Sequence, residues 1–297
     1  MLYIHIPFCH RKCTYCAFYS TVSSGDRQAY VDALCQELRL RRHVMEHPLH
    51  TVYWGGGTPS LLSIAHVEQI VATLRECYQT AEVVEATLEA NPEDLTPDYL
   101  RDLSRIGFFN RISIGVQSFH DDDLRLLNRR HNARQAVEAV RNAVAAGFDN
   151  VSVDLIYGLP GQTVEAWQDN LCRLASLPVC HLSAYALTVE DGTMLARQIE
   201  EGRVLPADEE QVLLQYAALQ HGRATMASPS TRCRTIAVRD GAPFTTAAIG
   251  TAPPTWVWVP RLTVLTASAA AGMWRTCVAM WRVWGGVLSH MKRRSWG

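Results

Sequence analysis

The chain has 297 residues, a hydrophobic share of 48%, nine cysteines and a formal net charge of -1 at pH 7. This length and apolar content predict a globular protein with a substantial core, which excludes the disordered and fibrous classes. Residues 1–6 form neither a basic leader nor a long apolar run, so we expect no secretion signal, no transmembrane segment and a cytoplasmic location. The odd number of cysteines also argues against a disulfide framework.

Short apolar segments and helical patterns alternate along the first two thirds of the chain. The expected strands are residues 2–6, 51–54, 83–90, 111–116, 150–156 and 181–187. The expected helices are residues 26–43, 65–78, a segment capped by Thr96 with Pro97 in its first turn, helical segments within 122–146, and 164–175. Such alternation indicates parallel strands joined by right-handed crossovers. We therefore predict an α/β fold, an open (β/α)6 partial barrel of TIM type, over residues 1–187.

Helical patterning returns beyond the last expected strand, at residues 194–201 and 208–219, and then stops. We assign residues 188–222 to a short helical linker toward an accessory domain. Residues 223–297 form a separate tail. The expected organisation is therefore a barrel, a linker and a tail.

Three cysteines follow the first expected strand at the spacing CxxxCxxC. Cys9, Cys13 and Cys16 can bind three corners of a four-iron, four-sulfur cube. The fourth iron is then open to the amino and carboxylate groups of S-adenosylmethionine, which indicates radical chemistry. The alternatives are a zinc knuckle or unrelated core thiols. Zinc favours a fourth Cys or His in a paired arrangement, and His10 lies too close within the loop.

Further polar or glycine-rich features lie at the carboxyl ends of the expected strands, where parallel α/β proteins collect reactive groups. Residues 55–58, GGGT, follow the second strand, and a backbone without side chains can approach a ligand closely. Glu89 ends the third strand, Gln117 follows the fourth and Asp154 lies near the end of the fifth. Taken singly, these features have structural alternatives: a tight turn, a salt bridge or an ordinary buried polar residue. Their convergence on one rim favours a binding site.

The chemistry of these side chains suggests how a ligand is held. Arg129 can pair with a carboxylate, Asp154 with a ribose hydroxyl or an ammonium group, and Gln117 with either. Tyr3 alternates with Leu2 and Ile4, so it faces either the site or the core.

Five motifs, in this order, resemble one known family: LYIHIPFCHRKCTYC, VYWGGGTPSLL, LEANPEDLT, NRISIGVQSF and DLIYGLPGQT. They are similar to the radical S-adenosylmethionine (radical SAM) proteins that include oxygen-independent coproporphyrinogen III oxidases and HemW-type heme chaperones, over about residues 1–220. The resemblance implies a [4Fe-4S] cluster on Cys9, Cys13 and Cys16. It also implies that S-adenosylmethionine is surrounded by Tyr3, Gly56, Gly57, Thr58, Glu89, Gln117, Arg129 and Asp154.

One position separates the two branches of this family. The oxidases typically carry a further cysteine two places after the third cluster ligand, where this chain has Phe18. Residues 187–193, LTVEDGT, are also similar to the HemW branch. The resemblance therefore implies a HemW-type heme chaperone, with heme as cargo and heme-acceptor proteins as partners. The oxidase is the alternative, so the resemblance leaves open whether the chain is an enzyme.

The tail differs from the rest of the chain in composition. Residues 223–297 carry one acidic residue against ten Lys or Arg, and six of the eight tryptophans, whereas residues 1–222 carry 28 acidic and 18 basic residues. The family motifs YEVSNY and HNSSYWDGTPYLGVGPSAHSFDG are absent as the residues stand. If every codon is read one base early, residues 230–236 permit the first motif and residues 244–267 the second. We therefore hypothesise that the tail is a frame-shifted translation of the family's C-terminal part, irregular in structure and defective in any heme or tetrapyrrole step.

The alternative is a genuine basic tail. Its aromatic residues would then stack on nucleic acid or lie at a membrane interface. They are Trp256, Trp258, Trp274, Trp281 and Trp284. The basic residues show no helical stripe, which favours the frame-shift hypothesis, so we expect no nucleic-acid partner.

Overall fold

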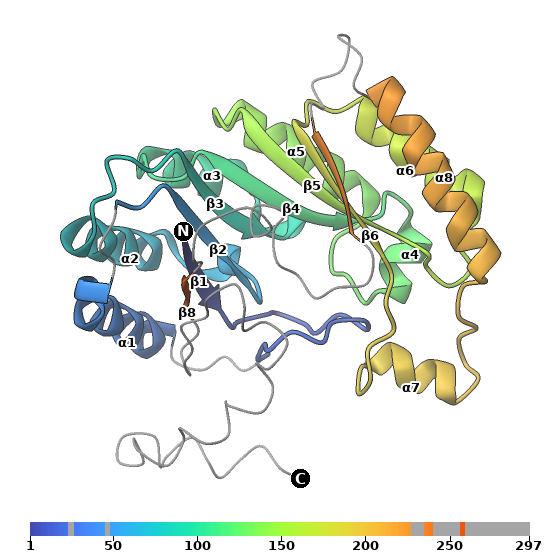
Figure 1. The fold of residues 1–297 in the computed structure, drawn as a ribbon, viewed down its shortest axis with the longest axis horizontal. Helices are drawn as coiled ribbons and strands as arrows, with labels where there is room; N and C mark the ends of the chain where they lie inside the picture. Colours follow the sequence, from blue (N-terminus) through green and yellow to red (C-terminus); the bar gives the residue numbers. More distant parts are fainter. Residues whose placement is uncertain (23–26, 45–47, 227–234, 240–255, 259–297) are drawn as a thin grey trace.

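A parallel sheet forms the centre of the protein in the computed structural model, which describes residues 1–22, 27–44, 48–226, 235–239 and 256–258 (Figure 1). Its six central strands are β1 (Leu2–Ile6), β2 (Thr51–Gly56), β3 (Glu85–Ala90), β4 (Arg111–Gln117), β5 (Asn150–Tyr157) and β6 (His181–Ala186). Neighbouring strands pair in parallel and in chain order. The strand order runs from one edge to the other without closing, so the predicted open (β/α)6 partial barrel is confirmed.

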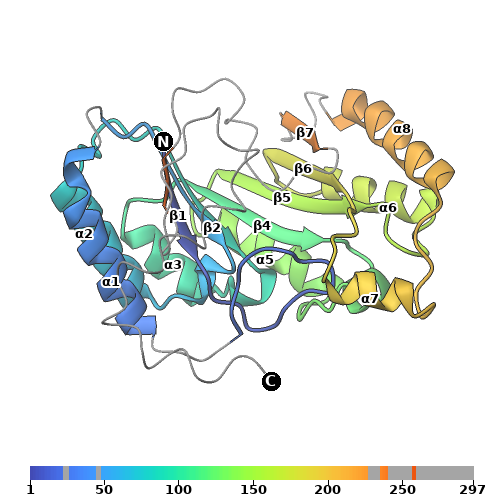
Figure 2. The same ribbon diagram turned by 60° about the horizontal axis from the view of Figure 1, so that its bottom comes forward.

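Helices lie along one face of this sheet (Figure 2). They are α1 (Arg27–Leu40), α2 (Ile64–Cys77), α3 (Pro97–Arg105), α4 (Asp121–Leu126), α5 (Ala133–Ala145) and α6 (Val164–Ala175). Thr96 caps α3 as predicted, since its hydroxyl accepts a hydrogen bond from the backbone amide of Tyr99 at 3.2 Å. The predicted helical region 122–146 is two helices, because the chain turns between them at Asn128, whose φ is 57°.

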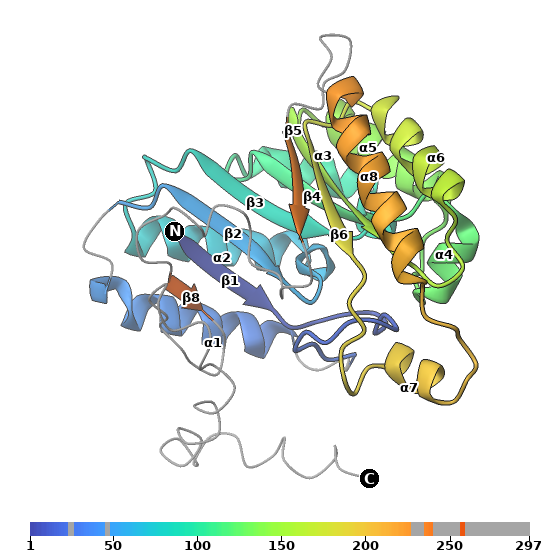
Figure 3. The same ribbon diagram turned by 45° about the vertical axis from the view of Figure 1, so that its right-hand side comes forward.

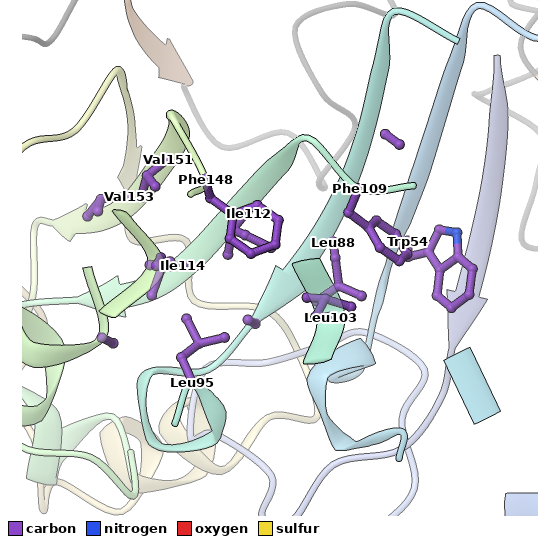
Figure 4. Close-up of a cluster of buried hydrophobic side chains, with 14 of the residues drawn as sticks. Trp54, Leu88, Leu95, Leu103, Phe109, Ile112, Ile114, Phe148, Val151 and Val153 are labelled. Atoms are coloured by element: carbon purple, nitrogen blue, oxygen red, sulfur yellow. The ribbon is translucent and has the colours of Figure 1, made fainter. Parts of the chain in front are cut away.

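Apolar side chains fill the space between the sheet and the helices (Figure 4). Trp54 of β2 is fully buried, and its ring meets Phe109 edge to face at a centroid distance of 5.1 Å. Further along the sheet, Ile112 of β4 and Val151 of β5 are also fully buried. The outward residues of the strands thus form one continuous core with the helices.

Two more helices follow the barrel, α7 (Met194–Glu200) and α8 (Glu209–Met226), close to the predicted linker helices. α8 lies beside α6 (Figure 3). Gln215 of α8 anchors it, because its side-chain oxygen accepts from the Gly158 amide at 2.7 Å and its amide group donates to the Gln162 carbonyl at 2.8 Å. Among the described residues, each helix is too short or too polar to cross a membrane.

Two segments of the tail are strands. β7 (Thr235–Arg239) pairs in parallel with β6, and β8 (Trp256–Trp258) pairs in parallel with β1. The expectation of an irregular tail is therefore wrong for these residues. Each edge of the central sheet offers unpaired backbone groups, and short β-branched or aromatic segments can pair with them whatever their side chains. The rest of the expected irregular tail lies outside the described residues.

Candidate functional site

The cysteine loop leaves the carboxyl end of β1 and is tied to its surroundings through the backbone. The Cys9 amide donates to the Thr21 carbonyl at 2.9 Å, which brings the two ends of the loop together. Thr14, in the middle, donates from its amide to Leu127 and from its hydroxyl to Leu126, at 3.2 and 3.0 Å. The Thr14 carbonyl accepts the amide of Leu195, the second residue of α7, at 2.8 Å. The loop is therefore held between the end of α4 and the start of α7 (Figure 3).

Cys9, Cys13 and Cys16 are free thiols, each partly exposed. Burial raises the pKa of the Cys16 thiol to about 11, so this sulfur is protonated near neutral pH until a cation binds it. Among the described residues, no three Cys, His, Asp or Glu side chains are close enough to hold a single metal ion. The ligands of an iron-sulfur cube bind different irons and need not converge on one point.

The glycine run lies directly against this loop. A β-carbon on Gly56 would come within 2.4 Å of the His5 ring, and one on Gly57 within 2.6 Å of the Phe8 carbonyl oxygen. Gly56 also has a φ of 110°, a conformation that other residues rarely adopt. These positions need glycine because β1, the cysteine loop and the end of β2 approach one another so closely.

Glu89 points into the same region and is paired with neutral groups. The Tyr53 hydroxyl donates to one carboxyl oxygen at 2.5 Å, and the Gly56 amide donates to the other at 3.2 Å. Burial raises the pKa of Glu89 to about 7, although the bond from Tyr53 opposes this rise. Glu89 thus has the hydroxyl partner that a carboxyl group in an apolar strand requires.

Asp154 of β5 is a second buried carboxyl group at this rim. The Ser113 hydroxyl lies 3.4 and 3.5 Å from its two oxygens, a weak contact. Burial raises the pKa of Asp154 to about 6. Two carboxyl groups with raised pKa values therefore face one space, which is typical of binding sites.

Arg129 and Gln117 supply a cation and a buried amide. Arg129 donates to the Cys13 sulfur at 3.4 Å, to the Asn91 side-chain oxygen at 2.7 Å and to the Gly115 carbonyl at 2.5 Å. Gln117 has a φ of 67°, and its side-chain oxygen is buried without a hydrogen-bond partner among the described residues. A buried acceptor without a donor is costly, so this oxygen is suited to a ligand's N–H or O–H group.

These side chains surround one cavity of about 300 Å³. Its lining includes every site residue expected from the sequence, namely Tyr3, Cys9, Cys13, Cys16, Gly56, Gly57, Thr58, Glu89, Gln117, Arg129 and Asp154. The lining also includes residues for which the sequence analysis predicted no role, among them His5, Tyr15, Tyr53, Asn91, Ser113 and Tyr185. Strand register offered a signal for some of them: Tyr53 lies beside Tyr3, and Ser113 beside Glu89, so each pair shares a face.

Comparisons with known proteins agree with this architecture. Residues 3–171 match the Radical SAM superfamily. The chain is 39% identical over 202 residues to the heme chaperone HemW of Haemophilus influenzae, a match that covers 66% of this chain and 52% of that protein. It is 36% identical over 213 residues to the heme chaperone HemW of Bacillus subtilis, covering 70% and 56% of the two chains.

A solved structure shows the same fold. The coproporphyrinogen III oxidase HemN of Escherichia coli, described as a radical SAM enzyme, superposes with a TM-score of 0.69 at 32% identity, over 76% of this chain and 52% of that one. The present chain thus spans about half the length of these relatives. Because the superfamily match covers more than half of its residues and the strand order agrees, the chain belongs to the radical SAM superfamily.

Proposed function

We propose that this chain is a radical SAM protein of the HemW type, which binds one [4Fe-4S] cluster through Cys9, Cys13 and Cys16. The single observation that carries this proposal is the cavity in which three free thiols face two carboxyl groups, a guanidinium group and an unpartnered amide oxygen. Such a donor set fits an iron-sulfur cluster beside a zwitterionic nucleoside ligand. A thiolate-held cluster requires a reducing compartment, so we propose the cytoplasm as its location.

S-adenosylmethionine would occupy the space in front of the cysteines. In this proposal Arg129 binds the carboxylate, whereas Glu89 and Asp154 accept from hydroxyl or ammonium groups; all three line the cavity. Gln117 offers its free oxygen, and Tyr3, Gly56, Gly57 and Thr58 complete the wall. When bound, the cluster supplies an electron for reductive cleavage of the sulfonium. The chain's own residues orient the ligand and limit its contact with water.

Heme as cargo, and transfer to acceptor proteins, are proposed from the two heme chaperones named above. Both are about twice as long as the matched part of this chain, and the tail is proposed to be read in a shifted frame. We therefore expect cluster binding but defective heme binding by the chain as it stands. Comparison with a frame-corrected chain tests this: tight, stoichiometric heme binding by both chains would contradict it.

The second candidate is a coproporphyrinogen III oxidase. Its support is the structural similarity to that enzyme of Escherichia coli. Phe18 stands in the cavity wall where the oxidases typically carry a cysteine, which favours the chaperone. Turnover of coproporphyrinogen by the frame-corrected protein would reverse this preference.

Anaerobic reconstitution with iron and sulfide tests the proposal. We expect about four iron atoms per chain and an absorption or EPR change when S-adenosylmethionine is added. C9S should lose the cluster. C180S is the matched control, because the Cys180 thiol donates to the Asp149 carbonyl at 2.8 Å and does not line the cavity. Zinc in place of iron, or equal iron content in both variants, would overturn the assignment.

A further inference from the structure

Two residues of the site depart from the usual behaviour of helix caps. Asn and Thr at the position before a helix normally accept a hydrogen bond from the helix's own backbone. Among the described residues, such a bond is made by Ser63, Thr96, Asn132, Thr163 and Thr193. Thr58 and Asn91 occupy the same position before the short 3-10 helices Pro59–Leu61 and Pro92–Asp94, yet neither side chain caps its helix. Both side chains can therefore make hydrogen bonds elsewhere in the site.

The two side chains bind each other and the surroundings of the cysteines. The Asn91 amide group donates to the Thr58 hydroxyl at 3.2 Å, and this hydroxyl donates to the Cys9 sulfur at 3.6 Å. On its other side, the Asn91 oxygen accepts from Arg129 at 2.7 Å, and Arg129 donates to the Cys13 sulfur at 3.4 Å. One asparagine thus connects the donors of two different cysteine sulfurs.

The backbone of Asn91 is fixed in turn. Its amide donates to the Ser60 hydroxyl at 3.2 Å, and Ser60 donates to Asp94 at 2.7 Å. Ser60 and Asp94 belong to the two 3-10 helices, so the side chain of Asn91 has little freedom to turn away. Its donor and acceptor are both used, which also fixes the orientation of its amide group.

We propose that Asn91 is a positioning residue: it holds Thr58 against Cys9 and Arg129 against Cys13, and thereby raises the redox potential of the cluster that these cysteines bind. The inference rests on the proposed cluster but on no heme or S-adenosylmethionine chemistry. Hydrogen-bond donors and a nearby cation stabilise the reduced cluster, which carries one more negative charge than the oxidised cluster. Loss of Asn91 removes the bond that holds the Thr58 hydroxyl and one of the two oxygen acceptors that hold Arg129, which keeps the Gly115 carbonyl.

Anaerobic redox titration of the reconstituted protein, without S-adenosylmethionine, tests this role. At the midpoint potential of the unaltered protein, we expect N91A to raise the ratio of oxidised to reduced cluster about tenfold. For a one-electron couple, this corresponds to a midpoint potential that is lower by about 59 mV. T58V should shift the ratio in the same direction by about threefold. The double variant should shift it by less than the product of the two, because Asn91 acts on Cys9 through Thr58.

N110A is the matched control. The Asn110 side chain also uses both its groups, accepting from the Ala86 amide and donating to the Val84 carbonyl, each at 2.9 Å, but at the opposite end of β3. We expect it to lower the melting temperature without changing the potential. A purely structural role for Asn91 would make N91A resemble N110A. An unchanged potential in an iron-replete N91A would overturn the proposal; if N91A does not retain iron, N91S takes its place under the same criterion. Absence of iron from the unaltered protein would instead refute the proposed function.

Discussion

The two faces of the central strands differ in the polarity and the surroundings of their side chains, although residues of both faces alternate along the same strands. On the helix side, Ile112 and Val151 are fully buried among apolar side chains. On the other side, their neighbours Ser113, Glu89 and Asp154 are polar and line the cavity. The helix side supplies hydrophobic stabilisation, whereas the cavity side holds buried polar groups that a ligand can satisfy. Within one strand, residues that stabilise the fold therefore alternate with residues that line the binding site.

The largest expected difference lies between adjacent residues of β4. I112A should lower the free energy of unfolding by about 2–5 kcal/mol, because it leaves a cavity in the core. S113A removes only a long contact to Asp154 and should cost at most about 1 kcal/mol. Urea denaturation of both variants measures the difference. Equal losses of unfolding free energy in the two variants would show that both faces contribute alike to stability.

The pH dependence of stability should come from the cavity face. Burial raises the pKa of Glu89 from 4.5 to about 7, so the folded chain binds this proton more tightly than the unfolded chain. Stability is therefore greatest below the unfolded pKa and falls as pH rises toward about 7, by on the order of 3 kcal/mol from Glu89 alone. Denaturation of the chain without S-adenosylmethionine from pH 5 to 8 should show this decline. E89Q should make the decline shallower but not remove it, because the pKa of Asp154 is also raised, to about 6. An equally steep decline in E89Q would exclude Glu89 as a source.

Binding of S-adenosylmethionine should depend on the same carboxyl group. E89Q retains the shape of the side chain but removes an acceptor of charge-assisted hydrogen bonds, worth about 1.5–3 kcal/mol. We expect affinity to fall by about 10- to 100-fold in equilibrium titration of the cluster-loaded protein. E138Q, on the exposed surface of α5, is the control and should bind normally. Unchanged affinity in E89Q would remove Glu89 from the ligand site.

The smallest effect should come from the outer surface of the helices, which belongs to neither face. Arg39 and Glu76 form an ion pair between α1 and α2 at 3.1 Å, and both side chains are more than half exposed. R39A should therefore change the free energy of unfolding by less than about 1 kcal/mol. Thermal melting at low and high salt measures it. A larger loss of unfolding free energy would mean that this contact between α1 and α2 contributes to stability as much as core residues do.

Much of the barrel could be predicted from the sequence because its signals are local. The alternation of apolar segments and helical patterns predicted all six central strands, and α6 occupies the predicted residues. The helical segments predicted within residues 122–146 are present as α4 and α5, but the turn at Asn128 between them is a backbone conformation that periodicity does not reveal. β7 and β8 were not predicted, because their pairing depends on open edges of a sheet that forms elsewhere in the chain.

The candidate site could be predicted in part for a related reason. The glycine run and the cysteine spacing stand out as motifs, and Gly56, Gly57, Thr58 and the three cysteines line the cavity. Asn91 and Tyr53 were not assigned roles, because an asparagine before a proline resembles a helix cap and a tyrosine in a strand resembles core. Their partners, Arg129 and Glu89, lie 38 and 36 positions further along the chain. Pairings between residues so far apart along the chain can be recognised only once the folded topology is known.

The backbone bond from Leu195 to Thr14 has a consequence for how small the working unit can be. A protein shortened to the barrel alone, residues 1–187, would keep every residue that lines the cavity, yet the cysteine loop would lose the backbone hydrogen bond that Leu195 of α7 donates to it. The minimal chain able to retain iron should therefore extend through Glu200. Assembly of the cofactor is thus linked to the folding of a segment that contributes no ligand.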